Sequence, residues 1–129
     1  DVNVVKQTTS TIFAGVNSGQ NHLLRPMMYD SYHQITNVSN PKGEDRIYSI
    51  VGYICESDTL GYDRKLKEVR VGDLLAISNA GAYGFSMSSN YNSRYRPAEV
   101  LIHKDKAHLI RKRENLNDLL QNQIEVDLV

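Results

Sequence analysis

An arginine and a tyrosine lie four residues apart in the segment Arg25-Pro26-Met27-Met28-Tyr29. Proline is accepted in the first turn of a helix, and residues one helical turn apart share a face. A guanidinium and a phenol on one face can both donate hydrogen bonds to a single carboxylate. The spacing therefore predicts a carboxylate-binding pair on a short helical turn. The alternative is that Arg25 is a surface residue in an ordinary ion pair.

The single cysteine, Cys55, ends an apolar run and is followed by Glu56-Ser57-Asp58. Polar side chains at the end of a strand are common components of functional sites. A thiol is mostly protonated at neutral pH, so it can donate a proton, and as a thiolate it is a nucleophile. The alternative is an inert cysteine in the core. One cysteine permits neither an internal disulfide nor a thiolate-rich zinc site, which favours a reducing compartment, the cytoplasm.

Tyr83 lies between glycines in Gly81-Ala82-Tyr83-Gly84-Phe85. Glycine lets the backbone approach a ligand closely, and a phenol can donate to a phosphate or a carboxylate. Ordinary aromatic packing is the alternative. Because residues 86–90 offer only part of the helix start that follows a phosphate-binding loop, we expect the tyrosine to matter more than the glycines.

Several classes of function are disfavoured by composition and spacing. The four histidines lack the close spacing of a zinc site, so we predict no metal. Fifteen basic residues balance fifteen acidic ones, which gives no overall field to attract nucleic acid. No apolar stretch approaches the roughly eighteen residues that a membrane helix needs, and no Gly-x-Ser-x-Gly segment indicates a hydrolase.

The elements that must position these residues are short strands. Composition and alternation predict them over residues 2–5, 10–16, 34–38, 46–54, 74–77 and 99–103. Residues 104–106 indicate a hairpin turn, and Asn115 with Asp118 predicts a capped C-terminal helix whose apolar face runs from Leu116 to Ile124. About seven strands with so few helices favour a mainly β fold, a small barrel or sandwich, over a parallel α/β fold.

A collinear series of motifs resembles diaminopimelate decarboxylase. The motifs are Gly19, Leu24-Arg25-Pro26-Met27-Met28-Tyr29-Asp30, Tyr32-His33, Val51-Gly52, Ile54-Cys55-Glu56-Ser57, Gly72-Asp73-Leu74-Leu75, Gly81-Ala82-Tyr83-Gly84-Phe85 and Arg96-Pro97-Ala98-Glu99. The resemblance implies that residues 1–129 are the C-terminal domain of that enzyme, an alanine-racemase-like β-barrel with a short helix near its start and a C-terminal helix. A (β/α)8 barrel takes about 250 residues, so the enzyme's cofactor-binding barrel cannot lie within this chain. The start without an initiator Met is likewise expected of a processed protein or of one domain from a longer one.

The resemblance also implies an activity. Enzymes of this family use pyridoxal 5'-phosphate to convert meso-2,6-diaminopimelate to L-lysine and CO2, the last step of lysine biosynthesis. The lysine that holds the cofactor would lie in the missing barrel, so we expect this segment alone to be inactive. The family further implies a cytoplasmic homodimer with a shared active site, in which Cys55 and Glu56 reach the site of the neighbouring subunit.

Individual roles carry over by motif. Arg25 and Tyr29 are similar to the pair that binds the distal carboxylate of the substrate, and Glu56 to the partner of its distal ammonium group. Tyr83 is similar to the residue that contacts both the cofactor phosphate and the substrate. Cys55 is similar to the proton donor to the α-carbon after CO2 leaves. An arginine and an acid together suit a zwitterionic substrate end, whereas a simple diamine needs acid alone.

The chain departs from the family pattern in the cysteine loop and, without touching a proposed ligand, at Val16-Asn17 and Ser18, and two alternatives stay open. Many members have a glycine between the serine and the aspartate after the cysteine, so Ser57-Asp58 makes this loop one residue shorter. One alternative is the β-domain of a decarboxylase acting on ornithine, arginine or a polyamine precursor, whose members tend to carry Asp where Glu56 stands. The other is a barrel that binds a partner without catalysis.

Overall fold

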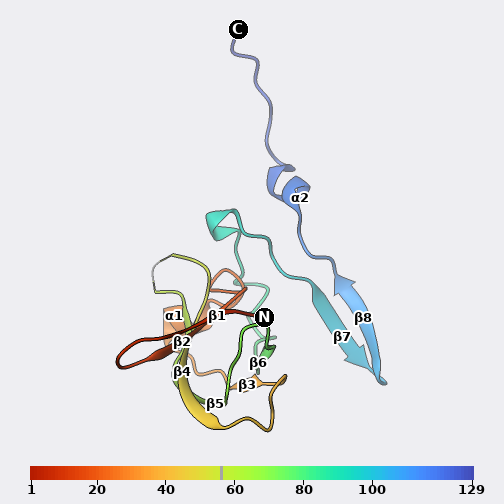
Figure 1. The fold of residues 1–129 in the computed structure, drawn as a ribbon. Helices are drawn as coiled ribbons and strands as arrows, with labels where there is room; N and C mark the ends of the chain where they lie inside the picture. Colours follow the sequence, from red (N-terminus) through yellow and green to blue (C-terminus); the bar gives the residue numbers. More distant parts are fainter. Residues whose placement is uncertain (56) are drawn as a thin grey trace. The chain divides into compact units, whose positions relative to one another are not determined.

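The structure of the chain is a computed structural model that describes residues 1–55 and 57–129, in two compact units, Asp1–Ser88 and Ser89–Val129. The first unit contains β1 (Val2–Gln7), β2 (Ile12–Val16), α1 (Arg25–Tyr29), β3 (Ile35–Asn37), β4 (Asp45–Val51), β5 (Thr59–Lys67) and β6 (Leu75–Ile77) (Figure 1). The second contains a 3₁₀ helix (Tyr91–Ser93), β7 (Glu99–His103), β8 (Lys106–Arg111) and α2 (Leu116–Leu120).

The main sheet of the first unit has the strand order β1-β2-β4-β5. Its outer pairs are antiparallel, but β2 and β4 are parallel, with Ala14 beside Ile50 and Gly15 beside Val51. Parallel neighbours need a long crossover, and here the crossover carries α1 and β3. The strand β3 pairs with β6 in a separate antiparallel sheet. Because β2 and β4 run in the same direction, the segments that follow them leave the sheet at the same edge.

The core lies in the first unit, where branched aliphatic side chains from β1, β2, β4 and β5 meet. Its buried hydrophobic members include Val2, Ala14, Val16, Leu23, Ile35, Tyr48, Ile50, Leu60, Leu66 and Val69. Tyr48 is 2 % exposed, and its hydroxyl accepts a hydrogen bond from the backbone N–H of Val69 at 3.0 Å. A buried phenol of this kind contributes apolar area and also satisfies a buried backbone donor.

A buried carboxylate, Asp73, ties β3 to the turn before β6. It accepts hydrogen bonds from the Asn37 side-chain amide at 2.9 Å and from the Arg70 backbone N–H at 2.9 Å. Burial alone would raise the pKa of Asp73, but these bonds and the Arg70 guanidinium outweigh it and lower the pKa. Asp73 is therefore a structural acid that is stabilised in its ionised form.

The second unit is a hairpin followed by a short helix. Lys104 and Asp105 both have positive φ angles, 47° and 60°, as a two-residue turn between β7 and β8 requires, so the predicted hairpin is confirmed. The predicted helix cap is also confirmed, since Asn115 accepts from the Asn117 N–H and Asp118 from the Asn115 N–H. The helix ends at Leu120, however, and the prediction that its face continues to Ile124 is wrong.

Comparison with the sequence predictions confirms the mainly β class, the short helix near the start and the C-terminal helix. Closure of the strands into a barrel stays a prediction. The predicted strand over 46–54 ends earlier, at Val51, because the backbone N–H of Gly52 turns to the carbonyl oxygen of Asp58 at 2.6 Å. The strand β5 was not predicted, because the charged run Asp63-Arg64-Lys65 hides its buried first half.

Candidate functional site

The helix α1 begins at Arg25 and holds Pro26 in its first turn, as the sequence predicts. Leu24 accepts backbone hydrogen bonds from Met27 and Met28, both at 3.1 Å. The helix stops at Asp30, whose φ of 51° is left-handed. This single turn is enough to bring Arg25 and Tyr29 to one side of the segment.

Arg25 and Tyr29 line a pocket of about 340 Å³ together with Tyr83 and Met87. The Arg25 guanidinium carbon lies 5.3 Å from the centroid of the Tyr83 ring, which is a cation–π contact. One guanidinium nitrogen also donates to the Ser31 hydroxyl at 3.4 Å. Three of the five residues that the sequence singles out are therefore together in one pocket.

The backbone at Tyr83 is unusual. Its φ of 61° is left-handed, which costs free energy for a residue with a Cβ and is common at binding sites. The surrounding turn is held by bonds from the Met87 N–H to the Tyr83 carbonyl and from the Gly84 N–H to the Gly81 carbonyl, each 3.3 Å. A Cβ at position 84 would overlap the carbonyl oxygen of Ala80, so this turn requires Gly84. The turn presents the Tyr83 side chain, 60 % exposed, to the pocket.

The loop between β4 and β5 carries the other two predicted residues. Cys55 is exposed, and it is not among the residues that line the Arg25 pocket. Glu56 lies outside the described residues. The sequence alternative of a buried, inert cysteine is wrong.

Asp58, at the end of the same loop, is 6 % exposed and bridges two segments. One carboxylate oxygen accepts the backbone N–H of Gln20 at 2.7 Å, and the other accepts the backbone N–H of Ile54 at 2.8 Å. Burial raises the pKa of Asp58, while these two N–H groups and nearby His22 act in the opposite direction. The carboxylate thus joins the segment before α1 to the cysteine loop.

Further bonds support the same junction. The Tyr53 N–H donates to the Ser18 carbonyl at 3.1 Å, and the Ser18 hydroxyl lies 3.0 Å from the His22 ring nitrogen Nδ1. The other ring nitrogen of His22 lies 3.4 Å from the Tyr53 hydroxyl. The segments after β2 and after β4 therefore form one connected unit at the edge of the sheet.

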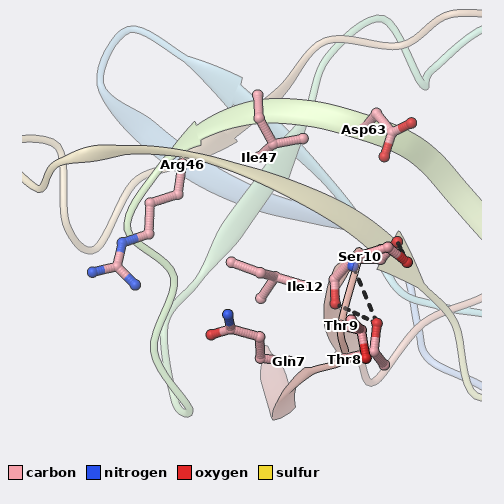
Figure 2. A pocket seen from close by; sticks show the side chains of 9 residues that line it. Gln7, Thr8, Thr9, Ser10, Ile12, Arg46, Ile47 and Asp63 are labelled. Atoms are coloured by element: carbon pink, nitrogen blue, oxygen red, sulfur yellow. Dashed lines mark hydrogen bonds between the residues drawn. The ribbon is translucent and has the colours of Figure 1, made fainter.

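A second pocket, of about 380 Å³, lies at the turn between β1 and β2. Figure 2 shows its hydroxyl-bearing turn, Thr8 to Ser10, facing Arg46, Ile47 and Asp63 on the neighbouring strands. Arg46 is engaged with Glu68 at 3.5 Å. None of the predicted site residues lines this pocket.

The described residues contain no group of three or more His, Cys, Asp or Glu side chains placed to hold a metal ion. Within the same residues, neither helix has the length and apolar character needed to cross a bilayer.

The family described as "Pyridoxal-dependent decarboxylase, C-terminal sheet domain" matches residues 1–81. The chain belongs to this family. Its matched region includes α1, the cysteine loop and Asp58, and ends just before Tyr83.

Curated relatives and solved structures of this decarboxylase family extend the match beyond residue 81. Diaminopimelate decarboxylase of Methanothermobacter thermautotrophicus is 51 % identical over 124 residues, which are 95 % of this chain and 29 % of the relative. The crystal structure of diaminopimelate decarboxylase from M. jannaschii superposes with a TM-score of 0.90 at 44 % identity, over 97 % of this chain and 29 % of that one. The enzyme from Helicobacter pylori complexed with L-lysine gives a TM-score of 0.84 at 40 % identity, over 93 % and 29 %. The chain therefore spans less than a third of the length of these relatives.

The chemistry of the Arg25 pocket fits part of a pyridoxal phosphate site. Its lining offers one guanidinium and two phenols, which donate hydrogen bonds to phosphate or carboxylate oxygens, and Met87, which is apolar. The described lining includes no acidic side chain that would repel an anion. The donors of this lining are Arg25, Tyr29 and Tyr83.

Three residues of this decarboxylase domain were missed by the sequence reasoning. Ser31 and Met87 are ordinary residue types, and no sequence signal distinguishes them. Asp58 had a signal, because Gly19 and Gly52 both lie where a Cβ would overlap its carboxylate. Two glycines in separate loops that enclose one buried acid are recognisable only once those loops are known to meet.

Proposed function

We propose that residues 1–129 are the C-terminal domain of a pyridoxal phosphate-dependent enzyme that converts meso-2,6-diaminopimelate to L-lysine and CO2. The observation that carries the proposal is that Arg25, Tyr29 and Tyr83, three hydrogen-bond donors, line one pocket. The identity of 51 % to a curated diaminopimelate decarboxylase over 95 % of the chain supports the same reaction. The domain alone is expected to be inactive, because the cofactor-binding barrel is supplied by another part of the protein.

Arg25 and Tyr29 bind the distal carboxylate of diaminopimelate. A guanidinium donates two parallel bonds to a carboxylate, and the Tyr29 phenol adds a third donor from the next helical turn. Glu56 is assigned to the distal ammonium group. A site with both an arginine and an acid binds a zwitterionic end, and it leaves the arginine unpaired when the distal end of the substrate carries only an ammonium group, as in ornithine.

Cys55 donates the proton that completes the reaction. Bound pyridoxal phosphate supplies the electron sink that allows the α-carboxylate to leave as CO2. The α-carbon then needs a proton, which the thiol of Cys55 gives from its sulfur. The exposure of Cys55 suits a group that acts in a site completed by other parts of the protein.

The proposed assembly is a cytoplasmic homodimer with a shared active site. Cys55 and Glu56 of one subunit serve the site of the other, while Tyr83 contacts the cofactor phosphate and the substrate. Cys55 is the one cysteine among the 129 residues, which supports a reducing compartment.

The proposal is tested on the full-length protein loaded with pyridoxal phosphate and offered diaminopimelate, ornithine, arginine and lysine in parallel, with the products quantified. Lysine formed from diaminopimelate, with at least 100-fold lower turnover of the others, is the expected result. A preference for a diamine precursor overturns the substrate assignment. Failure to turn over any of them, in a protein that binds the cofactor, favours a domain retained for binding alone.

A further inference from the structure

We propose that Asp58 is a positioning residue for the reaction: its carboxylate fixes the cysteine loop to the segment that leads to Arg25. The proposal rests on the proposed function, which assigns proton donation to Cys55 and carboxylate binding to Arg25. The proposal goes beyond that function because it names the group that determines the positions of both Cys55 and Arg25.

The geometry of Asp58 is that of a two-sided clamp. Its Oδ1 accepts the Gln20 N–H at 2.7 Å, and its Oδ2 accepts the Ile54 N–H at 2.8 Å. Gln20 lies five residues before Arg25, and Ile54 is the immediate neighbour of Cys55. Each oxygen therefore binds the backbone of one functional segment. The two segments lie close together because they follow β2 and β4, which are parallel and end at the same edge of the sheet.

The backbone around the Asp58 carboxylate leaves it no space to move. A Cβ at Gly19 or at Gly52 would overlap the Oδ2 of Asp58, so the carboxylate is enclosed by backbone on both sides. The Gly52 N–H also donates to the Asp58 carbonyl at 2.6 Å, which fixes the main chain of Asp58. The Thr59 N–H bonds to the Ser57 carbonyl at 2.8 Å, and Ser57 has a left-handed φ of 50°, so the chain turns tightly around Asp58.

The chemistry of the clamp requires a carboxylate. Two N–H groups approach different oxygens, and an isosteric amide offers one oxygen and one NH₂ group. In Asp58→Asn one N–H therefore faces another donor, and either the Gln20 side or the Ile54 side must move. A displacement near 1 Å at a group that transfers a proton can lower turnover about 100-fold.

A second buried carboxylate provides the matched control. Asp73 is 6 % exposed, like Asp58, and it also accepts one backbone N–H, from Arg70, but its partners Asn37 and Arg70 belong to neither loop. Asp73→Asn therefore reports the cost of losing a buried carboxylate without moving Cys55 or Arg25.

The test uses the full-length holoenzyme and compares Asp58→Asn with Asp73→Asn. The measurements are kcat and KM for diaminopimelate, the thermal midpoint, and the rate at which iodoacetamide alkylates Cys55, resolved by peptide mass spectrometry. In Asp58→Asn we expect kcat to fall at least tenfold and Cys55 to be alkylated at least threefold faster. In Asp73→Asn we expect a lower thermal midpoint with kcat and the alkylation rate within twofold of the parent.

A second variant covers the case in which Asp58→Asn does not fold. Gly19→Ala keeps the carboxylate but places a methyl group against it, so it is expected to reproduce the faster alkylation of Cys55 in milder form. Unchanged kcat, KM and alkylation in a folded Asp58→Asn or Gly19→Ala enzyme would overturn the proposal. The alkylation rate does not depend on the substrate, so a change in it without any diaminopimelate turnover in the parent would sustain the clamp and reject the proposed function.

Discussion

Replacing Arg25 by methionine removes the one cation among the described residues that line its pocket, while keeping an unbranched side chain of similar length. In the structure the guanidinium is already oriented by the Tyr83 ring at 5.3 Å and the Ser31 hydroxyl at 3.4 Å, so little ordering is needed before it binds a carboxylate. Hydrogen bonds to charged groups contribute about 1.5–3 kcal/mol each. Because the two bonds of one guanidinium are not independent, we expect Arg25→Met to lose about 2–4 kcal/mol of the free energy with which the enzyme binds its substrate.

At about 1.4 kcal/mol for each factor of ten, this loss lowers kcat/KM for diaminopimelate about 30- to 1,000-fold. Most of the change is expected in KM, because in the proposed function Arg25 would bind the distal carboxylate equally before and during the reaction. Arg25→Lys keeps the charge but loses the planar pair of donors and the stacking on Tyr83, so we expect a smaller loss, about tenfold.

The assay is steady-state decarboxylation by the full-length enzyme. Arg46→Met is the matched control, because Arg46 is an arginine of the same unit that lines the other pocket and pairs with Glu68 at 3.5 Å. We expect kcat/KM of the control to stay within threefold of the parent. If Arg25→Met also stayed within threefold, the distal carboxylate would have to be bound elsewhere, and the assignment of this pocket would be refuted.

Three further predictions concern the thiol, the core and the second unit. Cys55→Ala should lower kcat about 100-fold or more with KM changed less than threefold, and a large rise in KM at preserved kcat would contradict its role as proton donor. Tyr48→Phe leaves the buried Val69 N–H without its acceptor, so the free energy of unfolding in urea should fall by about 1–3 kcal/mol. Burial would raise the pKa of Glu114, but bonds from the Arg96 and Asn90 groups outweigh it and lower the pKa below its usual 4.5. The ionised Glu114 therefore stabilises the folded unit above pH 4.5, and this contribution is lost as the pH falls through the lowered pKa. In Glu114→Gln the midpoint of urea unfolding should therefore fall less steeply as the pH is lowered below 4.5.

The elements that the sequence predicts well are those with local signals. The cap at Asn115 and Asp118 and the turn at Lys104 and Asp105 depend only on residues within a few positions, and both occur in the structure. The strand β5 was not predicted because the signal for it is not local. Its charged middle lies on an exposed face, and only pairing with β4 along its length makes it a strand.

The candidate site divides in the same way. The grouping of Arg25 with Tyr29 follows from helical spacing, but the presence of Tyr83, more than fifty residues later, in the same pocket depends on how the chain returns to α1. The role of Asp58 is harder to predict from the sequence, because that role depends on the parallel pairing of β2 with β4. A parallel pair with a long crossover leaves no sequence pattern at either strand that identifies the other.

The parallel pairing of β2 and β4 has a consequence for engineering this domain. Substrate preference among such decarboxylases is a natural target for loop exchange, and the cysteine loop is short enough to be replaced as a cassette. A donor loop that is one residue longer would bring an additional residue between Ser57 and Asp58. The aspartate of the donor loop would then have to accept the hydrogen bond of the Gln20 N–H, whose position belongs to the recipient domain. The unit of exchange is therefore the pair of segments 17–24 and 52–58, taken together from one parent.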